Sequence, residues 1–166
     1  MKRHLHYFIV SGCALVLLPL LASSVYSQPL TTLTEDDVRA MLNQWERAAR
    51  KRDVAGIMAP LAKDVKLKIA ITTPQSNGEQ SGYMTREQYE FNVRHNVRVI
   101  RSYKLERKNL KIKIYEDNTA MVESELYETF ITRYGTLRAS SSEVLFVGLK
   151  DGKVVVNSVD SRGRMY

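Results

Sequence analysis

The sequence predicts an α+β domain in which helices come first and a series of long antiparallel strands follows. Apolar residues alternate with polar ones over residues 110–114 and resume on alternate positions within 120–130, which is the period of a half-buried strand. Residues 116–118, Glu-Asp-Asn, separate the two runs and favour a tight turn. Residues 34–50, by contrast, carry apolar side chains at helical spacing. The hairpin at 109–130 therefore has one apolar face, and the helices are expected to cover it.

Residues 1–27 have the composition of a cleaved secretory leader. Basic Lys2 and Arg3 precede an apolar run over residues 8–22, and small residues follow it. The run is shorter than the roughly 20 residues that span a bilayer, which disfavours a retained membrane helix. The sequence thus predicts a signal peptide, a short tether at 28–33 and a mature protein that is periplasmic or secreted.

Cys13 lies within this leader, in the run Val-Ser-Gly-Cys, which resembles the motif that precedes a lipidated cysteine. The strongest apolar block comes after Cys13 rather than before it, which favours an ordinary small residue of the leader. Cys13 is the only cysteine of the chain. A cleaved protein therefore has no disulfide, no thiol nucleophile and no thiolate metal site.

The chain is basic, with a formal charge of +7 that falls to +5 once Lys2 and Arg3 leave with the leader. The remaining 139 residues suffice for one domain with a sizeable core. An exported protein does not meet cytoplasmic nucleic acid, so its charge suits anionic lipid headgroups, cell-wall polymers or an acidic protein. Residues 94–113 carry eight basic side chains against Glu106 alone. This run is either a contact patch for an anionic partner or an ordinary solvated face.

Each expected helix has a clear start. Thr34 caps the first helix, with acidic residues in the first turn and the apolar stripe behind them. Asp53 can cap a second, shorter helix that ends near Leu61. Thr85 caps the third helix, with Gln88 at the capping-box position.

Strand-type patterns fill most of the remaining chain, over residues 65–71, 103–115, 136–149 and 153–160. The Asp-Gly pair at 151–152 predicts a tight hairpin. Residues 72–82 contain a proline, an Asn-Gly pair and several polar residues, and they are expected to form a mobile loop. The folded domain is thus predicted at 34–161, with a polar tail at 162–166.

The order of helix, short helix, strand, loop, helix and strand meander resembles that of the nuclear transport factor 2-like, or SnoaL-like, superfamily. The local signals are the helix starts at 33–38 and 85–89, Trp45, the stretches 52–53 and 62–65, the strand start at 109–112 and the closing Asp-Gly-Lys-Val hairpin. The resemblance implies a strongly curved antiparallel sheet wrapped around two longer helices and one short helix, forming a cone with a cavity. Members include isomerases, dehydratases, cyclases and proteins without catalysis, so the fold alone does not choose a function.

The catalytic sets of such enzymes are incomplete in this chain. The isomerases pair a carboxylate base with a tyrosine and an acid, whereas Trp45 stands where that tyrosine is usual and residues 67–70 offer no carboxylate. The dehydratase-type members use two histidines, and the mature chain has only His95. A lone histidine predicts no metal site, and no cofactor fingerprint is present.

Glu128 and His95 remain as candidate catalytic residues. Glu128 shares strand parity with Val122 and Phe130, and an inward carboxylate with a raised pKa could act as acid or base. A β-bulge would turn it to solvent instead, and we expect that orientation because burying an unpaired carboxylate costs more than a bulge. His95 lies about 40° outside the core arc of its helix, which favours an exposed flank over a base at the cavity rim.

Six further residues are candidates for contact with a ligand: Met41, Trp45, Tyr89, Asn92, Asn96 and Ser124. The polar groups could be the few convergent groups of an apolar pocket, or they could bond to sheet carbonyls. Met41 and Trp45 share a stripe with Val38 and Leu42, which favours core packing over contact with a cofactor.

The sequence and the resemblance together favour an exported, non-catalytic domain that binds a small apolar molecule or a partner protein. The alternative is an isomerase, cyclase or dehydratase with Glu128 or His95 as general base and Tyr89 or Asn96 orienting the substrate. A homodimer through the outer face of the sheet is a further expectation, because proteins of this class often associate in that way.

Overall fold

The computed structural model describes residues 31–74 and 78–166, and the expected leader at 1–27 lies outside the described residues. Helix α1 (Glu35–Lys51) begins at the predicted cap, where the Thr34 side chain accepts a hydrogen bond from the Asp37 backbone N–H. The Asp37 carboxylate in turn accepts from the Thr34 backbone N–H, which completes a capping box. The apolar stripe of α1 buries Val38 and Leu42 against the sheet.

The rest of the chain forms two more helices and one six-stranded sheet. Helix α2 (Val54–Met58) leads into β1 (Leu61–Thr72), β2 (Glu79–Met84) and α3 (Arg86–Val99), and α3 starts at the predicted capping box of Thr85 and Gln88. The meander then follows as β3 (Ile100–Ile114), β4 (Thr119–Thr132), β5 (Gly135–Lys150) and β6 (Lys153–Met165). The strand order is β2-β1-β6-β5-β4-β3, with β1 parallel to β6 and the other neighbours antiparallel.

Three predicted boundaries were wrong. Residues 79–82, expected in a mobile loop, belong to β2 and pair with β1. Residues 162–165, expected in a tail, continue β6 and pair with both β1 and β5. Helix α2 ends at Met58, because Leu61 already begins β1 beside β6. Each time, backbone pairing with a partner distant in sequence overrode the local composition.

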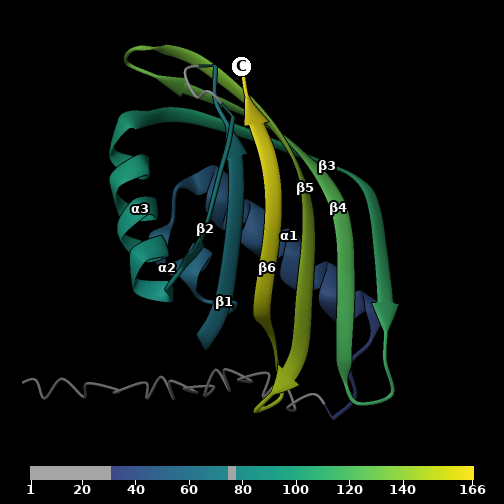
Figure 1. Cartoon of the computed structure of the whole chain (residues 1–166). Coiled ribbons are helices and arrows are strands. Elements are labelled where there is room, and N and C mark those ends of the chain that lie inside the picture. Colours follow the sequence, from purple (N-terminus) through teal and green to yellow (C-terminus); the bar gives the residue numbers. More distant parts are fainter. Residues whose placement is uncertain (1–30, 75–77) are drawn as a thin grey trace, which may run out of the picture.

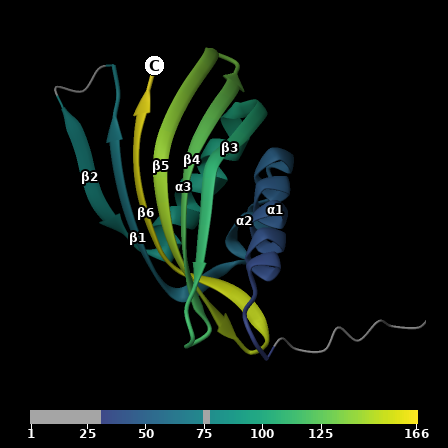
Figure 2. The same ribbon diagram turned by 90° about the vertical axis from the view of Figure 1, so that its right-hand side faces the viewer.

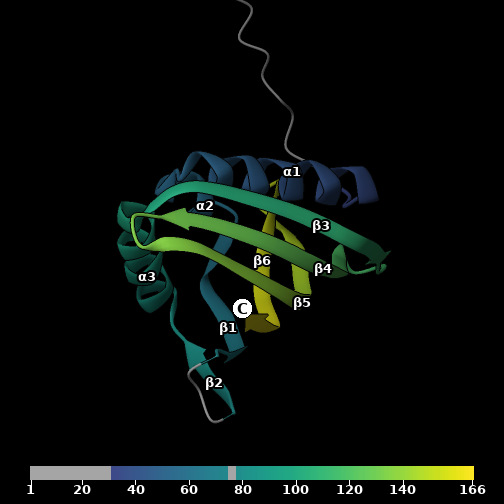
Figure 3. The same cartoon turned by 90° about the horizontal axis from the view of Figure 1, so that it is seen from above.

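The sheet is strongly curved, and the helices lie on its concave side. Figure 1 shows α1 crossing behind the meander strands, with α3 beside β1 and β2. Figure 2 shows α1 on one side of the bent sheet, and Figure 3 shows from above that β3 runs along α1 and bends towards α3. No helix within the described parts of the chain is both long enough and apolar enough to cross a membrane.

The inward side chains form rows across the sheet that change from apolar to small and polar. One row joins Val122, Leu145, Val159 and Leu67 across β4, β5, β6 and β1, and all four are buried. The next row is Ser124, Glu143, Ser161 and Ile69, and the one after it is Leu126, Ser141, Gly163 and Ile71. The first row packs into the core with α1, whereas the later rows leave space above the sheet. The hydrophobic core therefore ends where a cavity begins.

Candidate functional site

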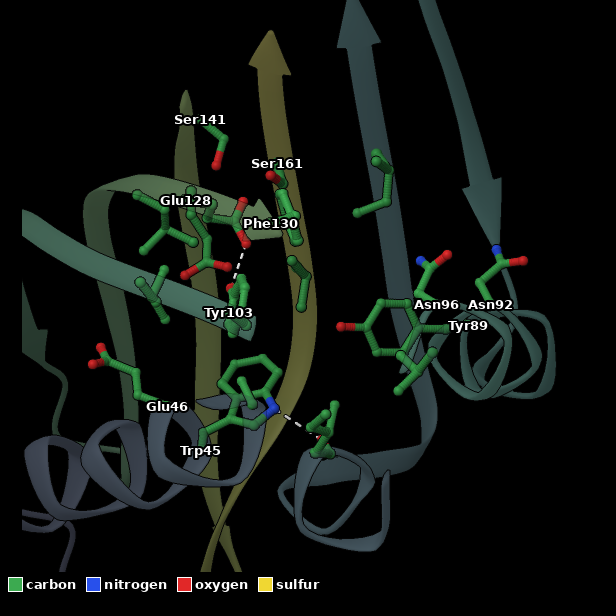
Figure 4. A pocket seen from close by; sticks show the side chains of 18 of the residues that line it. Trp45, Glu46, Tyr89, Asn92, Asn96, Tyr103, Glu128, Phe130, Ser141 and Ser161 are labelled. Atoms are coloured by element: carbon green, nitrogen blue, oxygen red, sulfur yellow. Dashed lines mark hydrogen bonds between the residues drawn. The ribbon is translucent and has the colours of Figure 1, made fainter. Parts of the chain in front are cut away.

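A cavity of about 410 Å³ lies between the inner face of the sheet and the three helices (Figure 4). The helices line it with Trp45, Ala49, Ile57, Tyr89 and Val93. The sheet contributes apolar side chains from β1, β3, β4 and β6, among them Leu67, Ile69, Leu105, Leu126, Phe130 and Val159. A mostly apolar wall with a few polar groups is typical of sites for small organic molecules.

Trp45 forms part of the cavity wall and is held in a fixed position. Its indole Nε1 donates a hydrogen bond to the Ile57 carbonyl oxygen at 2.8 Å, which ties α1 to α2. The half-buried ring packs against the core on one side and lines the cavity on another. Core packing, expected from the sequence, is therefore only part of its role.

A buried arginine lies in a cluster of ion pairs at the cavity. Arg107 of β3 donates to Glu46 of α1 at 2.8 Å, to Glu143 of β5 at 2.8 Å and to the Ser124 hydroxyl. The side chains of Arg107, Glu46 and Glu143 are only 8%, 12% and 9% exposed. Burial by itself lowers the pKa of Arg107, but attraction to Glu143 and the hydrogen bonds to Glu143 and Glu46 raise it overall. The cluster contains two carboxylates for one guanidinium group.

Glu128 faces the cavity, so the expected solvent-facing orientation was wrong. Strand β4 pairs with β5 in unbroken register from Thr119↔Gly148 to Thr132↔Gly135, so no bulge turns Glu128 outward. The register shifts near it lie instead in the pairing of β3 with β4, between Ile100 and Ser102 and between Lys108 and Lys111. The carboxylate is not unpaired either, because it accepts a hydrogen bond from the Tyr103 hydroxyl.

Tyr103 and Glu128 thus form a hydrogen-bonded pair inside the cavity (Figure 4). Burial raises the pKa of Glu128 and the charge of Glu143 adds to the rise, while the Tyr103 hydrogen bond and Arg107 oppose it. Burial also raises the pKa of Tyr103, and the charge of Glu128 raises it further. A buried carboxyl group with a raised pKa is a candidate general acid or base.

The raised pKa of Glu128 predicts a pH-dependent effect of Glu128→Gln on stability. The folded state binds the proton more tightly than the unfolded state, so ionising Glu128 costs stability as the pH rises above its ordinary pKa of 4.5. The variant lacks this cost, so its free energy of unfolding relative to the wild type should increase between about pH 4 and pH 7. Urea titrations across this range measure the difference, and Glu125→Gln on the outer face of β4 is the control. A difference that stays flat or falls with pH would contradict the prediction.

Tyr89 projects from α3 into the cavity, on the side opposite the Tyr103–Glu128 pair (Figure 4). Its hydroxyl forms no hydrogen bond with any residue in the described parts of the chain. Burial raises the pKa of Tyr89 to about 12, and the charges of Glu143 and Glu128 contribute to the rise. Tyr89 therefore offers a free donor and acceptor to a molecule in the cavity.

The other residues predicted for the site differ in whether they line the cavity. Asn92 and Asn96 lie on the exposed rim of the cavity. Met41 and Ser124 do not line it, because Met41 is buried in the core and Ser124 is bonded to Arg107. His95 is exposed and does not line it, so His95 is not retained as a candidate base.

Seven polar cavity residues were not predicted as site residues: Glu46, Arg52, Tyr103, Arg107, Ser141, Glu143 and Ser161. Arg107 was counted in the basic run at 94–113, although it shares inward parity with Tyr103 and Leu105. The signal that could have revealed this is Asn109, a residue type that tolerates positive φ and adopts φ 53° here. Asn109 marks the bulge beyond which the inward positions shift to Leu110, Ile112 and Ile114.

The polar groups of the cavity can exchange protons and form hydrogen bonds. The parts of the chain described by the structure contain no group of three or more His, Cys, Asp or Glu side chains that could hold a metal ion. Within the cavity, Glu128 can donate or accept a proton, and the Tyr89 hydroxyl can donate a hydrogen bond, whereas the single Tyr103 O–H already donates to Glu128.

Comparison with known proteins identifies the fold. By sequence, the chain matches no family model and no curated protein. By structure, it is similar to a nuclear transport factor 2-like protein from Cytophaga hutchinsonii, with a TM-score of 0.61 and 17% identity over 78% of this chain and 98% of that one. The fold is nuclear transport factor 2-like.

Other proteins with the nuclear transport factor 2-like fold include enzymes. A protein from Novosphingobium aromaticivorans, provisionally described as a scytalone dehydratase, matches with a TM-score of 0.63 and 14% identity over 77% of this chain and 82% of that one. A hexachlorocyclohexane dehydrochlorinase matches with a TM-score of 0.57 and 10% identity over 76% of this chain and 82% of that one. A third similar protein, from Pseudomonas putida, has no known function. At these identities the likeness establishes the fold alone.

Proposed function

We propose that this chain is an exported protein whose nuclear transport factor 2-like domain binds a small, mostly apolar molecule without transforming it. The observation that supports this proposal is the cavity. Its volume of about 410 Å³ falls within the range of small-molecule sites, and it corresponds to roughly a dozen water molecules. Export is supported by the leader-like composition of residues 1–27.

The composition of the wall supports an apolar ligand. The cavity is lined by Leu126, Phe130, Val159 and the ring of Trp45. Burying this apolar surface against a ligand contributes about 25 cal/mol of favourable free energy for each Å² removed from water. The space exists because Ser141 and Gly163 are small neighbours in one row of the sheet. Open volume beside an apolar wall favours binding over a purely structural role for this face.

Filling the cavity is expected to abolish binding. Ser141→Phe places a ring in the cavity, and we expect affinity for an apolar probe such as 1-adamantanemethanol to fall about 100-fold or more, because the ring occupies the ligand's space. Trp45 is the only tryptophan of the chain and lies in the wall, so its fluorescence reports binding directly. Ser142→Phe, on the exposed outer face of the same strand, is the matched control and should bind as the wild type does.

Two outcomes would count against the proposal. Equal binding by both phenylalanine variants would place the ligand outside the cavity. No bound species in native mass spectrometry of the purified protein, together with no response to apolar probes, would indicate a cavity that holds only water.

The Tyr103–Glu128 pair favours a second candidate function, acid–base catalysis on the bound molecule. Its carboxyl group has a raised pKa and lies in the same cavity, as a general base requires. On this interpretation the protein exchanges protons next to a carbonyl group, and in D₂O it would accelerate deuterium uptake by cyclohexanone. Glu128→Gln should then lower the rate by about 100-fold or more. A rate equal to that of buffer alone would leave binding as the function.

A further inference from the structure

The charged side chains of the cavity are predominantly acidic. Glu46, Glu128 and Glu143 line it, and Arg107 is the one cation among the described residues that is buried with them. Arg52 also lines the cavity, but its side chain is exposed and donates to the Ile100 carbonyl oxygen at 2.7 Å. The interior of the cavity is therefore acidic, although the chain as a whole carries a formal charge of +7.

Both cations already donate hydrogen bonds to groups of the protein. Arg107 bonds to two carboxylates and a serine hydroxyl, and breaking those contacts to receive an anion would expose buried Glu46 and Glu143 without a partner. A ligand carboxylate or phosphate would thus enter a space lined by carboxylates of the same charge. Anions are disfavoured in this cavity.

Tyr89 provides an independent indication of a polar group on the ligand. Its hydroxyl points into the cavity from α3, facing the sheet wall that carries Glu128, and has no partner among the described residues (Figure 4). Burial raises the pKa of this hydroxyl, and the charges of Glu143 and Glu128 add to the rise. A cation at this place would be attracted to both carboxylates and could donate to the phenol oxygen.

We propose that the cavity selects an apolar molecule that carries one protonated amine, with the ammonium group held by Glu128 and the Tyr89 hydroxyl and its apolar body against Trp45, Leu126 and Phe130. This inference rests on the proposed binding function and names its ligand class. The ammonium group supplies donors to the acidic wall, and the hydrocarbon part fills the apolar remainder of the cavity.

Three probes of one shape test the charge preference: 1-adamantanemethylamine, 1-adamantanemethanol and 1-adamantanecarboxylate. None absorbs where tryptophan does, so Trp45 fluorescence at pH 7 yields the three affinities for the full folded domain. We expect the amine to bind about tenfold or more tightly than the alcohol and the carboxylate to bind most weakly. Glu128→Gln should reduce the advantage of the amine over the alcohol by about tenfold, whereas Glu125→Gln on the outer face should preserve it.

The outcomes distinguish this inference from the binding function on which it rests. If the alcohol binds as tightly as the amine, or the carboxylate binds most tightly, the amine preference is wrong and apolar binding stands. If none of the three probes binds, both are wrong. The ranking on the wild-type protein needs no substitution, so it decides the matter even if Glu128→Gln is poorly folded.

Discussion

Arg107→Met is expected to lower the free energy of unfolding by about 3–5 kcal/mol, because it leaves two buried carboxylates without their partner. Glu46 and Glu143 both bond to Arg107 at 2.8 Å, and neither is more than 12% exposed. Methionine replaces the length of the side chain but none of its charge. Urea titration at pH 7 measures the loss, and the melting temperature should fall by roughly 10 °C or more.

Two variants show whether charge is the cause of that loss. Arg94→Met removes an arginine that pairs with Glu90 but is 59% exposed, and it should cost less than about 1 kcal/mol. Adding Glu46→Gln and Glu143→Gln to Arg107→Met should restore much of the stability, because no unpaired charge then remains buried. A loss of less than about 1 kcal/mol in Arg107→Met itself would show that the cluster is not buried in solution.

Leu145→Ala is expected to cost about 2–5 kcal/mol, the range for truncating a fully buried leucine. Leu145 is 0% exposed and lies in the apolar row between Val122 and Val159. Removing its side chain leaves a void that the paired strands cannot close without moving backbone. The free energy of unfolding of the purified variant measures this cost.

Leu137→Ala is the matched control for Leu145→Ala on the same strand. Leu137 is 45% exposed near the open end of β5, so its truncation should cost less than about 1 kcal/mol. Equal losses in the two variants would mean that stability is spread evenly along the inner face. In the structure, buried apolar side chains lie instead in the row of Val122, Leu145 and Val159, next to α1.

The features that could be predicted from the sequence are local ones. The capping boxes at Thr34 and Thr85 both form, and the Asp151-Gly152 turn joins β5 to β6. Each of these features depends on hydrogen bonds or dihedral preferences within a few residues, so the local sequence determines whether it forms. The hairpin at 109–130 also forms, with Asn118 at positive φ and its side chain accepting from the Leu33 backbone N–H.

The site was predicted less well because it depends on pairing between distant strands. Glu128 faces the cavity because the bulge occurs in β3, at Asn109, and not in its own strand. Arg107 and Glu143 meet only because β3, β4 and β5 align in one register, which period-two alternation does not specify. A charged residue at an inward position therefore looks like a surface residue in the sequence.

The basic run at 94–113 also changes meaning in three dimensions. Arg107 belongs to the run in sequence but lies at the cavity, paired with Glu46. Arg94 pairs with Glu90 on α3. Lys108 and other basic residues of the run lie on β3, an edge strand, where charge discourages pairing with another sheet edge. Contact with an anionic partner remains a prediction, because ion pairing and protection of the sheet edge already account for basic residues at these positions.

The central claim is that the space between the helices and the inner face of the sheet is a ligand site. Nuclear Overhauser contacts between protein protons and bound 1-adamantanemethylamine test it most directly. We expect contacts from the adamantane protons to the rings of Trp45 and Phe130, and from the aminomethyl protons to the Tyr89 ring. Contacts to Tyr127 or Phe146 on the outer face, or none at all with saturating probe, would contradict it.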